Sequence, residues 1–287
     1  MSDSDTDSNC LKNGKSLLLK RFYTLQEYFP LSNLLTDVNL FYSSILFYDK
    51  DLFTECVDFY NDYYGYTNNR LSVENAIAYA KLSNYLTADL WKSLLPMDEK
   101  KLEWFYKNNP FYLLGNLYRQ MHGIFHNYAE QILSKKFRNM LDFGGGAGGM
   151  VIHLARRGMD CSFFDTSDLQ SKWVTHISNK LGLGIKVFTS ESDIPNDFHF
   201  IFANDILEHV LRPQQLIETI KSHCSADGCY FISYTPLNGP DDLHPYHFRI
   251  SSKSGTFETS VEENIQSFAR DLNGFRNLVK PDNSFKK

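Results

Sequence analysis

The residues best suited to chemistry surround a glycine cluster in the middle of the chain. Residues 142–149 read Asp-Phe-Gly-Gly-Gly-Ala-Gly-Gly, directly after the apolar pair Met140 and Leu141. Glycine is required where the backbone turns with positive φ, or where a ligand touches the main chain with no Cβ between them. Asp165 ends a second apolar segment, 21 residues after Gly144, and a carboxylate at this spacing can bind both hydroxyls of a ribose. The pattern therefore predicts a nucleotide-type cofactor on this loop.

Two cofactors satisfy the glycine spacing, and the glycines alone do not separate them. Gly144, Gly146 and Gly149 fit the GxGxxG pattern of NAD(P)-binding proteins, in which a helix N-terminus holds a pyrophosphate. Asp142, followed by Gly144, Gly146 and Gly148, also fits the Asp-x-Gly-x-Gly-x-Gly pattern of S-adenosylmethionine binding. The methionyl arm of S-adenosylmethionine carries an ammonium group. An acidic Asp142 beside the loop suits that ammonium better than it suits a pyrophosphate.

Alternating strands and helices are expected to position this loop. From residue 138 onward, apolar strand-like segments alternate with amphipathic helical ones, which predicts an α/β fold with a doubly wound, mostly parallel sheet. Before residue 136, apolar residues recur mostly at helical spacing, so the N-terminal half is predicted to be all-helical. We predict a disordered leader at 1–16, a helical substrate or lid domain at 17–135 and a cofactor-binding domain at 136–287. The expected strands are 140–143, 160–164, 185–188, 198–203, 229–234 and 275–279, and the expected helices after 136 are 150–157, 168–181, 213–223 and 261–272.

The composition argues against several classes of protein. Apolar residues make up 43% of the chain and charged residues 22%, as in ordinary globular proteins, and the net charge of −5 argues against broad capture of nucleic acid. No apolar run reaches the roughly 18 residues of a membrane span, and the acidic N-terminus is unlike a secretory signal. Five scattered cysteines indicate a reducing compartment, and Cys224 and Cys229 lack the second ligand pair of a metal site. We expect a cytoplasmic protein that binds no nucleic acid, membrane or metal.

Residues 138–250 resemble the class I S-adenosylmethionine-dependent methyltransferases, in particular the small-molecule branch that includes the ubiquinone-biosynthesis type. The resemblance implies a Rossmann-like methyltransferase core behind an all-helical N-terminal domain, with S-adenosyl-L-methionine as cofactor. It also implies O- or N-methylation of a small molecule, as in a biosynthetic pathway. The segments that carry the resemblance are, in order, 141–148, 164–167, 193–195, 204–210, 226–232 and 244–248.

The resemblance assigns cofactor-binding positions at the ends of four strands. The glycines follow the methionyl and ribose parts of the cofactor, and Asp165 holds the ribose hydroxyls. Ser190 and Glu191 flank the adenine edge, where many relatives carry an aspartate at the position of Ser190. Asp205 and Ile206 face the methionyl end and the substrate. The full set is Asp142, Gly144, Gly146, Gly148, Asp165, Thr166, Ser190, Glu191, Asp205 and Ile206.

A general base is needed only if the methyl acceptor is protonated at neutral pH, as a phenol or an alcohol is. The candidates are His209, His244 and His247. His209 lies in an apolar junction and is interpreted as a packed structural histidine. His244 and His247 lie in a loop rich in proline and glycine after the fifth strand, at the ligand edge, and are the predicted catalytic residues.

The aromatic-rich N-terminal helices also need a role. Most buried aromatic residues belong to a core, but the predicted sheet has no other cover, so we expect these helices to form a substrate lid and a face for homodimerisation. Two other classes of function stay open at this point. One is a non-catalytic cofactor-binding or scaffold protein, and the other is an NAD(P)-dependent oxidoreductase.

Overall fold

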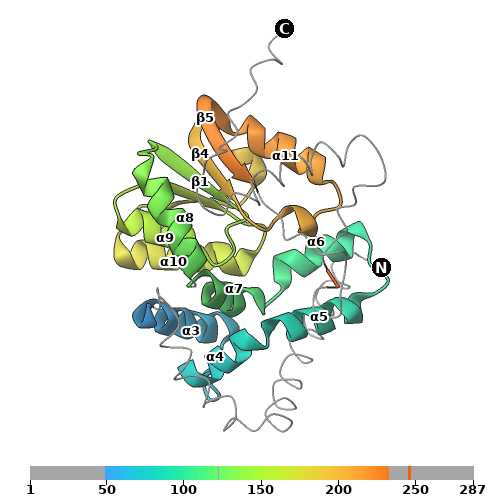
Figure 1. Cartoon of the computed structure of the whole chain (residues 1–287). Coiled ribbons are helices and arrows are strands. Elements are labelled where there is room, and N and C mark those ends of the chain that lie inside the picture. Colours follow the sequence, from blue (N-terminus) through green and yellow to red (C-terminus); the bar gives the residue numbers. More distant parts are fainter. Residues whose placement is uncertain (1–48, 122, 233–244, 247–287) are drawn as a thin grey trace. The chain divides into compact units, whose positions relative to one another are not determined.

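The structure is a computed structural model of the 287-residue chain, and it describes residues 49–121, 123–232 and 245–246 (Figure 1). For Lys50 and residues 123–127 only the backbone is described. All described residues belong to one compact unit, 46–287, and the unit 1–45 lies outside them. The predicted leader, the helix 261–272, the strand 275–279 and the two catalytic candidates His244 and His247 also lie outside the described residues.

The described strands form one five-stranded parallel sheet. Their order is β3-β2-β1-β4-β5, so the chain moves outward from β1 to β3 and then returns to add β4 and β5 on the other side. This order places the topological switch point between β1 and β4, where sheets of this kind bind ligands beyond the carboxyl ends of the strands. The predicted doubly wound parallel sheet is confirmed. The strands are β1 (Asn139–Phe143), β2 (Asp160–Phe164), β3 (Lys186–Phe188), β4 (Phe198–Ala203) and β5 (Cys224–Ile232).

Helices cover both faces of the sheet. Because side chains alternate along a strand, Leu141 and Phe143 share one face of β1, where they form a buried cluster with Ile220 of α11. On the opposite face the ring of Tyr128 in α8 lies 5.7 Å from that of Phe202 in β4, and Figure 1 shows α8, α9 and α10 on this side. These helices are α8 (Gly123–Ser134), α9 (Gly149–Arg156), α10 (Asp168–Leu181) and α11 (Pro213–Ser222), with short 3-10 helices η1 (Glu191–Asp193) and η2 (Leu207–His209).

The chain between residue 50 and α8 is helical, as predicted, and local signals set the helix ends. The side chain of Asp49 accepts a hydrogen bond from the N–H of Leu52 and caps the start of α3, and Gly65 ends that helix with φ of +68°. Helix α7 packs against α3, α4, α5 and α9, with Leu114 and Leu117 fully buried. The helices are α3 (Lys50–Tyr64), α4 (Val73–Lys81), α5 (Ser83–Leu94), α6 (Glu99–Asn108) and α7 (Tyr112–Gln120). None of the described helices is both long and apolar enough to cross a membrane.

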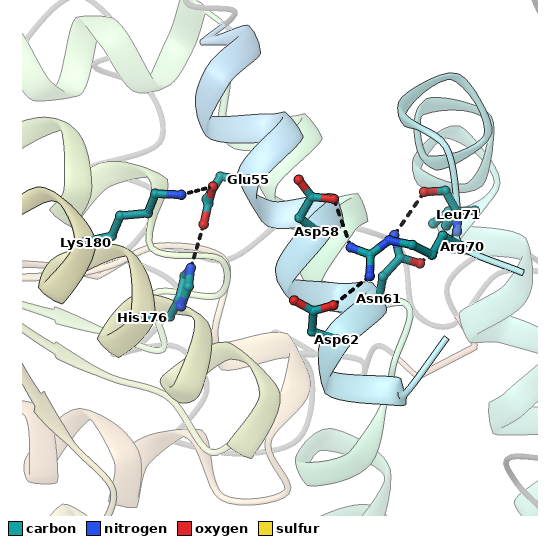
Figure 2. A network of polar contacts seen from close by, with 8 residues as sticks. All are labelled: Glu55, Asp58, Asn61, Asp62, Arg70, Leu71, His176 and Lys180. Carbon is teal, nitrogen blue, oxygen red and sulfur yellow. Dashed lines mark hydrogen bonds and ion pairs between the residues drawn. The ribbon is translucent and has the colours of Figure 1, made fainter. Parts of the chain in front are cut away.

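Polar contacts tie α3 to α10, a helix of the sheet domain (Figure 2). The carboxylate of Glu55 accepts a hydrogen bond from Nε2 of His176 at 2.7 Å and pairs with the ammonium of Lys180. Burial raises the pKa of Glu55, but the hydrogen bonds from Lys180 and His176 outweigh it, so the pKa lies below its ordinary value. The ring of Phe59 adds an aromatic contact with Trp173, with centroids 5.6 Å apart. The helical half is thus joined to the sheet half by specific contacts.

Strand β5 begins earlier than predicted, at Cys224 instead of residue 229. Its pairing with β4 shifts register, since Phe198 pairs with Cys224 and Phe200 pairs with Cys229. Residues 225–228, which precede the predicted strand, are therefore part of β5 and form an irregularity inside it. Gly228 explains why the two strands stay close, because a Cβ there would lie 2.7 Å from the carbonyl oxygen of Phe198.

Candidate functional site

The glycine loop lies at the carboxyl end of β1, next to the switch point of the sheet. Gly144 and Gly146 have φ of +69° and +59°, in the left-handed region that disfavours side chains. The N–H of Gly144 donates to the carbonyl of Phe164 at 2.7 Å, which directs the loop toward the end of β2. A Cβ on Gly144 would lie 2.5 Å from Cδ1 of Ile206, so Ile206 closes the β4 side of the loop.

Asp165 follows β2 and faces the glycine loop. Its Oδ2 accepts a hydrogen bond from the N–H of Gly146 at 2.9 Å, and its Oδ1 accepts from the N–H of Ser167 at 2.8 Å and from Gln170 at 3.3 Å. Burial raises the pKa of Asp165 to about 6, although the N–H groups of Ser167 and Gly146 act in the opposite direction. A carboxylate can accept about four hydrogen bonds, so Asp165 is held firmly at the loop with acceptor capacity left for a ligand hydroxyl.

Three amide side chains that are not among the predicted site residues lie against Gly146. A Cβ on Gly146 would lie 3.0 Å from Nδ2 of Asn116, 3.2 Å from Nε2 of Gln120 and 3.4 Å from Oε1 of Gln170. Asn116 also donates to Oε1 of Gln170 at 3.2 Å. Residues of α7 and α10 therefore place both donors and acceptors over the same turn of the loop.

Gln120 holds the loop from both ends. Its Nε2 donates to the carbonyl of Gly145 at 2.9 Å, and its Oε1 accepts from the N–H of Gly149 at 2.8 Å. The neighbouring Arg119 donates to Oδ1 of Asn116 at 2.5 Å. The sequence does carry a signal for these contacts. Asn116, Arg119 and Gln120 occupy positions i, i+3 and i+4 of one helix face, and the other side of the helix consists of buried leucines.

Asp142 lies beneath the glycine loop. Its side chain is 2% exposed and accepts a hydrogen bond from the N–H of Val151 at the start of α9, and its Oδ2 has no hydrogen-bond partner among the described residues. Burial, and then the nearby charge of Asp165, raise the pKa of Asp142 to about 8. The carboxyl is therefore largely protonated at pH 7. Its predicted attraction for an ammonium stays a prediction, and in the structure it caps α9.

The predicted adenine contacts lie at the ends of β2 and β3. Thr166 is exposed directly after Asp165, and Ser190 and Glu191 are exposed after β3. The hydroxyl of Ser190 accepts from the N–H of Ser192 and caps η1. No contact within the described residues joins Ser190 or Glu191 to the glycine loop, so their role stays a prediction.

The end of β4 supplies the last predicted positions. Asp205 is exposed, with φ of +53°, and its carboxylate accepts a hydrogen bond from Asn204 at 3.0 Å. Ile206 is half-buried against Gly144, as described above. Glu208, at 2% exposure, and His209 follow in η2. The structure thus brings the ends of β1, β2 and β4 together around the loop.

The N–H groups of this loop distinguish between the two cofactors that the sequence left open. A pyrophosphate site needs unengaged N–H donors at a helix N-terminus. Here the N–H of Gly146 donates to Asp165, that of Val151 to Asp142, and that of Gly149 to Gln120. Donors already held by protein oxygens, two of them carboxyl oxygens, do not suit a phosphate group. The same carboxylate of Asp165 suits the ribose hydroxyls of an adenosine, so the residues fit S-adenosylmethionine.

Comparison with known protein sequences points in the same direction. Residues 114–271, more than half of the chain, match the family described as "Methyltransferase domain". Norajmaline N-methyltransferase from Rauvolfia serpentina is 30% identical over 113 residues, which cover 37% of this chain and 39% of that protein. The matched part thus spans about two fifths of this curated relative.

Two solved structures are similar over part of their length. One is coclaurine N-methyltransferase bound to N-methylheliamine and SAH, at 15% identity and a TM-score of 0.37, covering 75% of this chain and 63% of that chain. The other is TehB from Haemophilus influenzae, at 21% identity and a TM-score of 0.34, covering 39% of this chain and 40% of that chain. At these identities the likeness concerns the fold alone.

Proposed function

Because the chain belongs to the methyltransferase-domain family, we propose that it transfers the methyl group of S-adenosylmethionine to an oxygen or nitrogen atom of a small molecule. The observation that carries this proposal is the use of the loop N–H groups by side-chain oxygens, Asp165 above all. That arrangement leaves a carboxylate for a ribose and disfavours a pyrophosphate. Norajmaline N-methyltransferase, the relative at 30% identity, supports a nitrogen acceptor.

The chain's own residues bind and orient the cofactor in this proposal. Asp165 accepts hydrogen bonds from the ribose hydroxyls, and the backbone of Gly144, Gly146 and Gly148 lies along the methionyl and ribose parts. Thr166, Ser190 and Glu191 contact the adenine, and Asp205 and Ile206 border the methionyl end. When bound, the cofactor supplies an electrophilic methyl group. Holding the acceptor in line with it can provide about 7–11 kcal/mol of the barrier.

The N-terminal helices are proposed as the substrate lid, and Tyr246 supports this role. Tyr246 lies between His244 and His247 in the sequence, is 3% exposed, and packs its ring 5.9 Å from Phe105 and 6.4 Å from Trp91. Tyr246 is therefore anchored to α5 and α6.

Two further expectations remain proposals. A cytoplasmic location is supported by the free thiols of the four described cysteines, Cys56, Cys161, Cys224 and Cys229. Homodimerisation through the N-terminal helices is supported by large apolar side chains at the surface of this half, such as Tyr85 and Leu95, which are 58% and 54% exposed.

Calorimetry with S-adenosylhomocysteine and with NADH, followed by transfer of a labelled methyl group from S-adenosylmethionine to a panel of phenols and amines, tests the proposal. We expect binding of S-adenosylhomocysteine alone, and label in at least one acceptor class. Binding of NADH in its place would identify an oxidoreductase. Binding of S-adenosylhomocysteine without label in any acceptor would identify a non-catalytic binding protein.

A further inference from the structure

A chain of hydrogen bonds joins α7 to the carboxylate of Asp165. Nη2 of Arg119 donates to Oδ1 of Asn116 at 2.5 Å, and Nδ2 of Asn116 donates to Oε1 of Gln170 at 3.2 Å. Nε2 of Gln170, a side chain that is 3% exposed, donates to Oδ1 of Asp165 at 3.3 Å. The other arm of the guanidinium, Nη1 of Arg119, donates to Oδ1 of Asn84 on α5. The chain therefore begins at a cation that two helices of the helical half hold in place.

The two ends of this chain fix the direction of both amides between them. A guanidinium has only donors, so Arg119 must face the oxygen of Asn116. The nitrogen of Asn116 then faces Gln170, whose oxygen accepts from it. This turns the nitrogen of Gln170 toward Asp165, and an ionised carboxylate can only accept. Reversing one amide or both would place two donors or two acceptors against each other. As long as Arg119 is in place, a donor therefore faces Asp165.

A donor directed at Asp165 favours its ionised form over its neutral form. Burial opposes ionisation and raises the pKa of Asp165 to about 6, and the N–H groups of Ser167 and Gly146 act against burial. The chain from Arg119 adds a side-chain donor to these two backbone groups. Because only the ionised carboxylate accepts from both ribose hydroxyls, this donor bears directly on cofactor binding.

Other ionisable groups surround Asp165 within the part of the chain that the structure describes. Asp142 on β1 is buried, and its pKa of about 8 leaves it largely protonated at pH 7. The pKa of Tyr112 on α7 is raised by burial above all and also by the charge of Asp165, so this phenol is neutral. Helix α10 begins with an exposed ion pair, Asp168 with Lys172 at 2.9 Å. These four groups together add little net charge beside Asp165 at pH 7.

We propose that Arg119 is a positioning residue that acts through Asn116 and Gln170 and keeps Asp165 an ionised acceptor for the ribose hydroxyls. This inference rests on the proposed function. The amides keep their protons, so the chain transmits orientation and polarisation and moves no proton. Helix α7 thereby extends the range in which the cofactor binds toward lower pH.

The charge of Asp165 can be followed in the full-length protein without any cofactor. NMR of 13C-labelled aspartate carboxyl groups from about pH 4.5 to about pH 8 covers both sides of the pKa of about 6, and Asp165→Asn assigns the signal. We expect Arg119→Gln, which removes the charge and the donor-only end of the chain, to raise the pKa of Asp165 by about 0.5–1 unit. That is less than the roughly 1–3 units of a direct arginine contact.

A second variant separates the chain from a direct effect of charge. Asn116→Leu interrupts the hydrogen bonds while Arg119 keeps its charge, and it should raise the pKa of Asp165 as much as Arg119→Gln does. The double variant should add nothing further, because both changes remove one function. Arg70→Gln is the matched control, since that guanidinium belongs to the helical half and bonds two carboxylates of α3 (Figure 2). The control should leave the pKa of Asp165 unchanged.

Calorimetry with S-adenosylhomocysteine distinguishes this role from a merely structural one. A pKa raised by 0.5–1 unit lowers the ionised fraction of Asp165 about two- to fivefold at pH 6, at most about twofold at pH 7 and hardly at pH 8. The Kd of Arg119→Gln should increase by these factors, with circular dichroism to verify folding at each pH. A site that was only distorted would lose affinity equally at every pH.

Three results would overturn the inference. The first is an unchanged pKa of Asp165 in Arg119→Gln. The second is a raised pKa in Arg119→Gln but not in Asn116→Leu, which would identify a direct effect of charge. The third is a loss of affinity that is the same from pH 6 to pH 8. If the wild type does not bind S-adenosylhomocysteine, the proposed function is refuted, and the NMR result still decides whether the chain controls Asp165.

Discussion

The pKa of Asp165 gives a quantitative test of cofactor binding. The pKa is raised to about 6 because the carboxyl is buried, and only the ionised form accepts hydrogen bonds from both ribose hydroxyls. With this pKa, about nine tenths of the carboxyl is ionised at pH 7 and about one tenth at pH 5. The affinity for S-adenosylhomocysteine should therefore be close to its maximum at pH 7 and should decrease as the pH is lowered through 6. The expected loss between pH 7 and pH 5 is about tenfold in Kd, or about 1.4 kcal/mol.

Asp165→Asn removes the titration and keeps the shape of the side chain. Its remaining oxygen can still accept an N–H of the loop, but a hydrogen bond to a charged group contributes roughly 1 kcal/mol more than one to a neutral group. The variant at pH 7 should thus bind about as weakly as the wild type at pH 5, and its Kd should stay constant between these pH values.

Isothermal titration calorimetry with S-adenosylhomocysteine, with circular dichroism to verify folding at each pH, measures this effect. Asp168→Asn is the matched control, because Asp168 is an exposed carboxylate three residues away that pairs with Lys172 at 2.9 Å. The control should retain the affinity and pH profile of the wild type. A wild-type Kd that does not change between pH 7 and pH 5, or equal losses in Asp165→Asn and Asp168→Asn, would refute the assignment of the ribose to Asp165.

Three further substitutions probe the surroundings of the site. Gly146→Ala and its control Gly182→Ala both place a side chain at positive φ, which should destabilise the fold by about 1–2 kcal/mol in each variant. Of these two glycines, only Gly146 has neighbours within 4 Å of the new Cβ. Calorimetry should therefore show lost affinity for S-adenosylhomocysteine in Gly146→Ala alone. Asp142→Asn should flatten the decrease in melting temperature between pH 5 and pH 8, because a folded-state pKa of about 8 lies above the unfolded value and makes ionisation destabilising as pH rises. Glu55→Gln should lower the free energy of unfolding in urea by about 1 kcal/mol at pH 7, since its partners are partly exposed. That loss should shrink as the pH falls through the lowered pKa of Glu55, where the wild-type carboxylate is also neutralised.

Strands β1, β2 and β4 could be predicted because nearly all of their residues are buried, so that each reads as an apolar run. β2 matches its predicted bounds at Asp160–Phe164, and α10 matches at Asp168–Leu181, where Gly182 ends the helix. The irregular start of β5 could not be read in the same way. Whether a polar stretch such as 225–228 leaves a sheet or stays in it depends on the neighbouring strand, here through the close approach of Gly228 to Phe198.

The directions in which the side chains of the site point could not be predicted from the sequence either. Asp142 precedes the glycines as the pattern requires, yet its carboxyl points under the loop to the N-terminus of α9. The spacing of residues along one loop carries no information about which side of that loop a neighbouring side chain occupies. The surroundings of His209 are likewise set by a residue distant in the sequence, because the phenol that contacts its Nδ1 comes from α6, 103 residues earlier in the chain.

The contacts of α7 change how the helical half relates to the site. Gln120 bonds to both ends of the glycine loop, and Asn116 lies against Gly146. Both residues precede the predicted boundary at 135/136, and the family match begins at residue 114, inside α7. In addition to the proposed lid role, the helical half thus contributes side chains that contact the glycine loop directly. We therefore expect the affinity for the cofactor to respond to substitutions on α7.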